Sequence, residues 1–334
     1  EKHCHISKRL KNEIKSKISE TVSETYIAKE TNVSVHTVRR IIDDTTRLLK
    51  IKPLHDLPEH LCFDEFKSVK SSDSNMSFII CDSSTDKLVD VVRDRKSYSL
   101  KKYFHRFEPK TRLKVKTISI DMYLPYIQLI KEMFPNAKII IDPFHIVQAL
   151  NRELNRTRVR VMNKHRYKDS KLYRKLKHYW KLILKNSNEL QNYKYNRYKL
   201  FESFITSKGI VDYILEKNPS LKNDYEVVHS LRECIQDRDY IEFKETIEAA
   251  TQLDLSPGLK RVLKTLMTYL PYIQNTCEYP TRTNGPIEGI NNKIKVLKRN
   301  AYGFRNYYHF RNRIILITKM FGPKQKGIKQ QLVA

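Results

Sequence analysis

Three acidic side chains stand out in this sequence because of their positions. Asp64 lies within the apolar run of residues 61–66, Asp121 ends the run Ile-Ser-Ile-Asp at 118–121, and Glu288 is the last acidic residue of the chain. An ionised carboxylate among apolar neighbours carries a desolvation cost unless a cation compensates it. Each acid has a simpler explanation by itself, since a strand-end Asp can cap a turn and a helical Glu can pair with Lys. As a set they are candidate catalytic metal ligands.

Carboxylates that converge from separate elements repel one another, and divalent cations relieve that repulsion. Magnesium takes oxygen ligands and keeps several waters and phosphate oxygens in its shell. Two such ions about 3.5–4 Å apart can activate an attacking hydroxyl and stabilise the departing oxygen. The three acids therefore predict in-line phosphodiester displacement with two Mg²⁺ ions, for which Mn²⁺ is an expected substitute.

The elements expected to position these acids form a mixed α/β sheet. Runs rich in Ile, Val and Phe, separated by polar residues, predict strands at residues 61–66, 77–81, 87–92, 113–120 and 137–141. Residues 123–134 have helical spacing between the last two strands. Three consecutive strands followed by strand, helix and strand are typical of ribonuclease H-like nucleases. In such a sheet the first and fourth strands are neighbours, so Asp64 and Asp121 would meet.

A late helix is expected to carry the third acid. Pro286 suits the first turn of a helix, where its missing amide hydrogen has no partner to lose. Its apolar residues recur at one face of the helix, at Ile287, Ile290, Ile294 and Leu297. Glu288 then lies one turn into this helix.

Residues 26–42 have the pattern of a helix-turn-helix. Residues 26–30 and 34–42 read as helices, Asn32 tolerates the left-handed backbone of a tight turn, and Ser34 is a plausible N-cap. The second helix of this motif enters the DNA major groove. The side chains expected to project outward and bind DNA are His36, Thr37, Arg39 and Arg40. Two short helices and a turn also occur in proteins that never touch DNA.

Composition favours a polyanionic partner. The 334 residues contain 64 Lys and Arg against 37 Asp and Glu, a formal net charge of +27. Double-stranded DNA is the first candidate, an anionic membrane surface the second, and a merely basic solvated surface the simplest alternative. No apolar run approaches the length of a membrane span.

Two segments concentrate this charge. Residues 151–185 hold 13 Lys and Arg against two acids, with Tyr and Trp interleaved, a composition suited to tracking a nucleic-acid backbone. Aromatic side chains packing beneath a solvated basic face are an equally good explanation of any single ring. The residues expected to bind DNA here are Arg156, Arg158, Arg160 and Lys164. The segment after Glu288 is a second basic surface, with the expected contacts Lys293, Lys298, Arg299 and Arg305, joined by Arg311 and Arg313.

Five scattered cysteines, none in a Cys-x-x-Cys pair, argue against a structural zinc site in this sequence and against a disulfide framework. Reduced cytoplasmic thiols are expected from this pattern. His3, Cys4 and His5 form a small cluster that is either a polar terminus or a residual metal-binding edge.

Several motifs together resemble the ISL-three family of bacterial insertion-sequence transposases. They are residues 60–67 (HLCFDEFK), 120–126 (IDMYLPY), 136–147 (NAKIIIDPFHIV), 283–293 (TNGPIEGINNK) and 298–304 (KRNAYGF). The resemblance covers residues from about 20 to 322. It implies a DDE-type acid triad of Asp64, Asp121 and Glu288 on a ribonuclease H-like core that is interrupted by an all-α insertion.

The resemblance has two further implications. Asp142 and His145 match an Asp-x-x-His element and are expected to support the metal ligands or to position DNA; alternatively, Asp142 only ends a strand and His145 packs in a helix. Glu65 is the most credible rival of Asp64, although strand alternation would put only one of them in the site. The resemblance also implies a cysteine-rich zinc-binding segment ahead of the helix-turn-helix, of which Cys4 is a candidate edge.

The expected organisation has five parts, namely a helical DNA-binding domain with the helix-turn-helix (1–55), the first part of the catalytic core (56–150), a basic α-helical insertion (151–278), the final part of the core (279–322) and a basic tail (323–334). The expected function is binding of terminal inverted repeats, cleavage at the transposon ends and joining of the 3′-hydroxyl to target DNA, by a homodimer that holds two ends. A helix-turn-helix regulator without catalysis and a structure-selective nuclease of the same fold remain alternatives.

Overall fold

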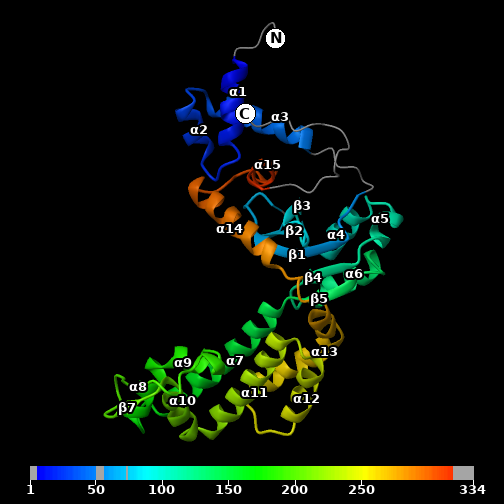
Figure 1. Cartoon of the computed structure of the whole chain (residues 1–334). Helices are drawn as coiled ribbons and strands as arrows, with labels where there is room; N and C mark the ends of the chain where they lie inside the picture. The colour runs from blue at the N-terminus through cyan, green and yellow to red at the C-terminus, as the bar shows by residue number, and fades with distance from the viewer. Residues whose placement is uncertain (1–5, 50–55, 73, 319–334) are drawn as a thin grey trace. The chain divides into compact units, whose positions relative to one another are not determined.

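The computed structural model of the chain describes residues 6–49, 56–72 and 74–318 (Figure 1). The cluster of His3, Cys4 and His5 and the tail from 323 lie outside these residues. The chain forms two compact units. The core unit consists of the residues up to 140 together with those from 281 onward, and the helical unit consists of residues 141–280.

A five-stranded sheet in the order β3-β2-β1-β4-β5 is the centre of the core unit. Its strands are β1 (His60–Lys67), β2 (Met76–Asp82), β3 (Lys87–Val92), β4 (Thr117–Ile120) and β5 (Lys138–Ile141). β2 is antiparallel to both β1 and β3, whereas β1 and β4 run parallel. The mixed α/β sheet expected from the sequence is confirmed, and its strand order is compatible with a ribonuclease H-like core.

The fourth strand is shorter than the sequence predicts. Residues 113–120 were expected to be extended, but β4 begins only at Thr117. Helix α5 (Pro109–Leu113) precedes it, with Pro109 in its first turn. Proline is favoured in the first turn of a helix because its fixed φ suits that position, and this local preference outweighs the apolar character of Leu113.

Strand β1 shows strict alternation between the two faces of the sheet. Cys62 and Phe66 belong to the apolar cluster formed with α14 (Gly285–Asn300) and α15 (Tyr307–Ile317). Phe63 faces the other way, where its ring lies 5.6 Å from that of Phe104 at the end of α4 (Ser97–Phe104). Helix α6 (Leu124–Met133) also covers this second face, through Tyr126 against Phe78. Asp64 therefore shares its face with α14.

Helix α14 packs through the apolar face predicted for it. Ile287, Ile290, Ile294 and Leu297 are all buried, in one cluster with residues of β1, β2 and β3. Burial of a Leu or Ile side chain contributes about 1.5–3 kcal/mol, so four such residues hold this helix firmly on the sheet.

The N-terminal part of the core unit contains three helices, α1 (Lys8–Lys17), α2 (Glu24–Glu30) and α3 (Val35–Leu49). The backbone of Asn32 between α2 and α3 is left-handed, with a φ of 52°, as its sequence position predicts. The hydroxyl of Ser34 accepts a hydrogen bond from the amide of Thr37 at 3.1 Å, which makes Ser34 the cap of α3.

The helical unit is built around α7, which packs against α11 and α13. Its helices are α7 (Pro143–Lys164), α8 (Ser170–His178), α9 (Trp180–Leu184), α10 (Ser207–Glu216), α11 (Pro219–Asp237), α12 (Tyr240–Ala250) and α13 (Pro257–Glu278), with a 3₁₀ turn η1 (Ser187–Glu189). The prediction that this segment is all-α is wrong in one place, because β6 (Asn196–Arg197) and β7 (Phe204–Ile205) form a small antiparallel sheet. Two-residue strands are too short to produce an alternating pattern in the sequence.

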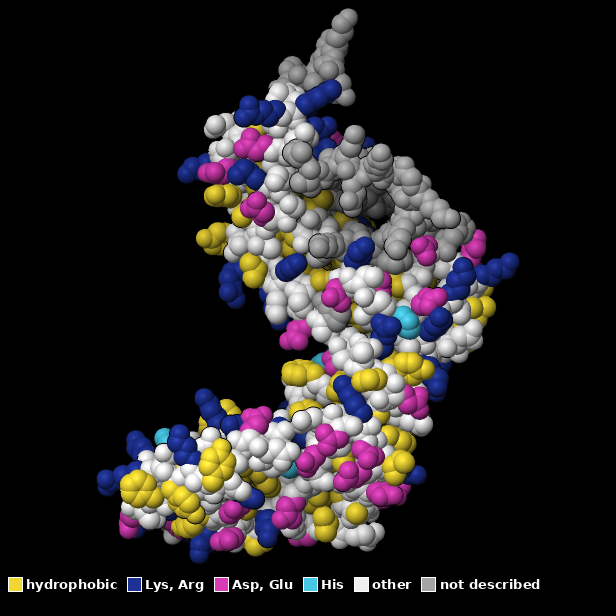
Figure 2. All heavy atoms as spheres, in the orientation of Figure 1, with side chains coloured by type: hydrophobic (Ala, Val, Ile, Leu, Met, Phe, Trp, Pro, Cys, Tyr) yellow, Lys and Arg dark blue, Asp and Glu magenta, His cyan; other side chains and the backbone are white. Residues whose placement is uncertain are grey.

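Lys and Arg side chains are interspersed with hydrophobic ones over the end of the helical unit that carries α8 and β7, as Figure 2 shows. Tyr167, Tyr193 and Phe204 are among the exposed aromatic residues of this unit. Across the described parts of the chain, no helix combines the length and the apolar character needed to cross a membrane.

Candidate active site

Asp64 and Asp121 lie on neighbouring parallel strands. The register of β1 and β4 pairs His60 with Thr117 and Cys62 with Ser119. Continuing this register by two residues brings Asp64 opposite Asp121. Both residues are half-buried. The expectation that these two strands are neighbours is confirmed.

Two asparagines connect α14 to these two acids. Asn284, directly before the helix, donates through Nδ2 to Oδ1 of Asp121 at 3.2 Å. Asn291 donates through Nδ2 to Oδ2 of Asp64 at 2.7 Å. The sequence reasoning missed both asparagines as site residues, although their spacing around Glu288 was a usable signal. Residues at i, i+4 and i+7 share one face of a helix, so Glu288 lies on the face that joins the two asparagines.

Glu288 reaches this position because of the packing of α14. The neighbouring Ile287 and Ile290 are buried against the sheet, whereas Glu288 is exposed in the first turn. The positive end of the helix dipole favours an acidic side chain in this turn. Glu288 is therefore an exposed carboxylate on the face of α14 that carries Asn291.

Glu65 is excluded from this group by its partners on the opposite face of the sheet. Its carboxylate accepts hydrogen bonds from Arg95, at 2.6 Å, and from the hydroxyl of Tyr126. Burial, reinforced by the bond to Glu65, raises the pKa of Tyr126, so the phenol keeps its proton and remains a donor. Glu65 therefore binds α6 to the sheet, while Asp64 faces α14.

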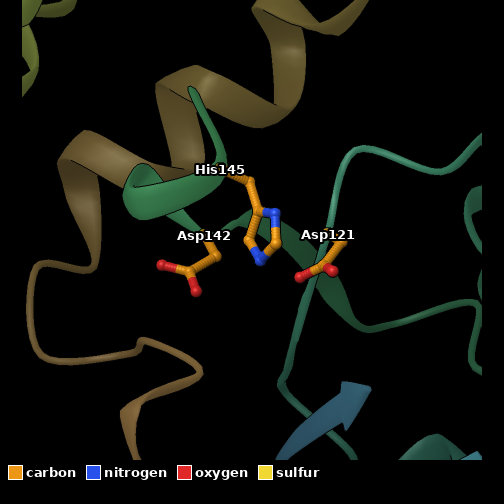
Figure 3. A group of neighbouring side chains, drawn as sticks. All are labelled: Asp121, Asp142 and His145. Carbon is orange, nitrogen blue, oxygen red and sulfur yellow. The ribbon is translucent and has the colours of Figure 1, made fainter. Parts of the chain in front are cut away.

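Asp121 also lies close to Asp142 and His145 (Figure 3). One ligand atom of each residue lies within 4.8 Å of those of the other two. Asp142 directly follows β5 and caps α7 by accepting from the amide of Phe144 at 3.2 Å, and His145 follows in the first turn. Two carboxylates and an imidazole are ligands that Mn²⁺ and related divalent ions accept. Among the described residues, no other His, Cys, Asp or Glu trio comes this close, so Asp64 and Glu288 lie outside this tight group.

The outward residues predicted on α3 differ in their surroundings. His36 and Arg40 are exposed, whereas Thr37 is half-buried and contacts the hydroxyl of Ser34. Arg39 pairs through Nε with Glu24 on α2 at 3.1 Å, and about half of its side chain remains exposed. An exposed basic face on α3 is thus available to a ligand.

On α7, one predicted DNA contact is wrong. Arg156, Arg160 and Lys164 are exposed, and Arg156 pairs with Glu153. Arg158 is instead buried and donates to the carbonyl of Leu176 at 2.9 Å. Burial lowers the pKa of Arg158, and its guanidinium serves the contact between α7 and α8 rather than a DNA backbone.

Some of the basic residues after Glu288 are exposed and others are partly or fully buried. Lys293, Arg299 and Arg305 are exposed. Lys298 is half-buried and donates to the carbonyls of Lys67 and Ser68, and burial lowers its pKa.

Two arginines assigned to this basic surface are not on it. Arg311 pairs with the buried Asp90. Arg313 is completely buried and donates to the carbonyls of Ile18, Glu20 and Val22, between α1 and α2. Burial lowers its pKa to about 10. These guanidiniums satisfy polar groups inside the core unit, because a buried carbonyl without a donor is costly.

Comparison with known proteins identifies the family. A family model described as a transposase, of the ISL3 (ISL-three) DDE type, matches residues 61–314. The chain belongs to this family.

Two curated proteins are similar to this chain. The transposase for insertion sequence element IS1001 of Bordetella parapertussis is 27% identical over 289 residues, which cover 85% of this chain and 67% of that protein. A protein of Lactococcus lactis subsp. lactis described as an ATP-dependent protease is 37% identical over 121 residues, or 36% of this chain and 38% of that protein. The chain thus spans well under half the length of the second of these proteins and about two thirds of the first.

Proposed function

We propose that the chain cleaves DNA at the ends of its insertion sequence and joins the freed 3′-hydroxyl to target DNA, with Asp64, Asp121 and Glu288 as the catalytic acids. The observation that carries this proposal is the pair of hydrogen bonds from Asn284 and Asn291 to the two aspartates. These bonds flank Glu288 on its helix and so support a convergence of all three acids at one edge of the sheet.

Divalent metal ions fit this set of side chains. Asp64, Asp121 and Glu288 offer only carboxylate oxygens, the ligands that Mg²⁺ prefers, and Mn²⁺ is an expected substitute. When bound, two such ions supply activation of the attacking hydroxyl and stabilisation of the departing oxygen.

The chain's own residues orient the acids for this chemistry. The amide of Glu65 donates to Oδ1 of Asp64 at 2.6 Å while Asn291 donates to Oδ2, so the carboxylate is held from both sides. Outer partners of this kind fix the direction of ligand lone pairs. We assign Asp142 and His145 a supporting role beside Asp121, in holding a metal ligand or in positioning DNA.

DNA binding is assigned to three surfaces. We propose that α2 and α3 form a helix-turn-helix, in which His36, Arg39 and Arg40 face the terminal inverted repeats. Exposed basic residues of α7 and of the α14–α15 region contact the DNA backbone. Affinity that depends on such phosphate contacts falls steeply with salt. A homodimer that holds two ends, and a helical unit inserted between the two parts of a ribonuclease H-like core, complete this proposal.

Cleavage of a labelled duplex carrying the element's own ends tests the proposal. Asp64→Asn, Asp121→Asn and Glu288→Gln should each abolish Mg²⁺-dependent nicking and leave duplex affinity within about twofold, because each change removes one ligand and hardly alters shape. Glu65→Gln, on the opposite face of the sheet, is the matched control and should retain nicking.

Two other outcomes would favour the alternatives. Binding of the ends without nicking by the wild-type chain would favour a regulator. Nicking without joining of precut ends to a target plasmid would favour a structure-selective nuclease.

A further inference from the structure

Tyr302 occupies an unusual position at the end of α14. Its backbone is left-handed, with a φ of 51°, and its side chain is completely exposed. The amide of Tyr302 donates to the carbonyl of Arg299 at 3.1 Å, and that of Gly303 donates to the carbonyl of Lys298 at 2.8 Å. This pair of bonds is the Schellman helix end, whose left-handed position is usually glycine.

Tyrosine is a poor choice for the backbone at this position. A bulky residue at positive φ is an outlier, and such strain concentrates at functional sites. Burial gives nothing in return, since the Tyr302 ring is fully exposed. The fold therefore does not explain this aromatic side chain, whereas a ligand that stacks on it would.

The surroundings of Tyr302 are hollow and basic. Tyr302 lines two cavities, a larger one of about 1070 Å³ and a smaller one of about 380 Å³. Ser23 also lines both of them. The cationic residues that line the larger one are Arg39, Lys67, Lys70, Lys298 and Arg305. The smaller one is lined by Tyr26, whose ring is half-exposed, and by Arg299.

Two acids, Glu24 and Asp43, line the larger cavity together with these five cationic residues. Glu24 pairs with Arg39 and His309, and Asp43 accepts a hydrogen bond from Asn312 at 2.8 Å. Cationic side chains consequently outnumber the acids around Tyr302, which suits an anionic ligand.

We propose that Tyr302 is the stacking platform for a single unpaired DNA base, which enters the smaller cavity between it and Tyr26, while Arg299 and Arg305 contact the adjoining phosphates. A base within a duplex has both faces covered by its neighbours, so only an unstacked base offers a face to this ring. Aromatic rings among cationic side chains are the usual means of binding such bases. The inference rests on the proposed DNA function and specifies the form of DNA taken at this site.

The test uses the full chain with divalent ions chelated, so that no cleavage occurs. The probes are a duplex with one bulged 2-aminopurine and the same duplex fully paired. The wild type should prefer the bulged probe by between about fivefold and about a hundredfold, the range expected for one base stacked on one ring, and should quench its fluorescence.

Matched variants make the test specific. Tyr302→Phe should keep the preference and the quenching. Tyr302→Gly should lose the preference and the quenching but bind the paired duplex as the wild type does. This variant should fold, because glycine is the residue that this helix end favours. Tyr98→Ala, which removes another well-exposed ring of the core unit, should change neither.

The proposal is overturned if the wild type does not distinguish the two probes or if Tyr302→Gly retains the preference. In either case, retained Mg²⁺-dependent nicking of the element's ends would leave the proposed function intact. A wild type that binds neither probe and nicks no ends would overturn both.

Discussion

Replacing Asn291 with Ala is the sharpest single perturbation of the proposed site. The change removes the donor 2.7 Å from Oδ2 of Asp64 and leaves the carboxylate itself in place. The amide oxygen of Asn291 is buried without a hydrogen-bond partner, so little else is lost. Any defect should therefore arise from the orientation of Asp64.

The size of the effect follows from the kind of bond. A hydrogen bond to a charged group contributes about 1.5–3 kcal/mol, and about 1.4 kcal/mol corresponds to a tenfold change in an equilibrium constant. We expect Asn291→Ala to weaken metal-dependent cleavage by roughly 10- to 100-fold, as is common when the partner of a metal ligand is removed. The free energy of unfolding should fall by a similar amount, about 1.5–3 kcal/mol, because the same bond joins α14 to β1.

The assay is the initial rate of nicking of a terminal duplex across a Mg²⁺ titration. Asn291→Ala should shift the Mg²⁺ concentration for half-maximal rate upward, with partial recovery at high Mg²⁺. Asn292→Ala, the exposed neighbour on the same helix, should behave as the wild type. An unchanged Mg²⁺ profile for Asn291→Ala would refute the assignment of this residue to the metal-binding carboxylates.

Three further outcomes are expected. Burial lowers the pKa of His229 to about 4, so His229 stays neutral in the folded helical unit while the unfolded chain takes up a proton below about pH 6.5. Because the folded pKa is depressed, the contribution of neutral His229 to the free energy of unfolding should be fully present above about pH 6.5. It should fall by up to about 3 kcal/mol as the pH drops toward 4. His229→Gln should flatten this part of the pH profile, measured by urea unfolding. Ile294→Ala should lower the free energy of unfolding by about 2–5 kcal/mol because the side chain is buried beneath α14, whereas the exposed Val296→Ala should have little effect in the same urea titration. Tyr302→Gly should raise the free energy of unfolding by about 1 kcal/mol, since it relieves a left-handed backbone, and an unchanged or lower value would contradict the strain assigned there.

Local patterns in the sequence were sufficient to predict the elements that carry the acids. The apolar alternation of β1 separates Asp64 from Glu65, the spacing of Ile287, Ile290 and Ile294 orients α14, and the position of Asn32 marks a left-handed turn. These features depend on residues within a few positions of one another, so periodicity and backbone preference determine them.

Other features depend on residues far apart in the chain, and only the tertiary structure decided them. A charged residue type does not reveal its own burial. The sequence predicts Arg158 and Arg313 at the surface, although both donate to backbone carbonyls inside the protein. The partners of Asp64 and Glu65 were equally hidden, since Asn291 lies 227 residues from Asp64 along the chain.

The sequence by itself determined that Asp64 lies within one strand, that Asp121 directly follows another, and on which face of the late helix Glu288 lies. Only the packed sheet decided that the two strands present Asp64 and Asp121 side by side and that Asn284 and Asn291 hold them from α14. The physical reason is range: backbone and periodicity preferences act over a few residues, whereas a hydrogen bond between side chains forms only after hydrophobic burial has brought distant segments together.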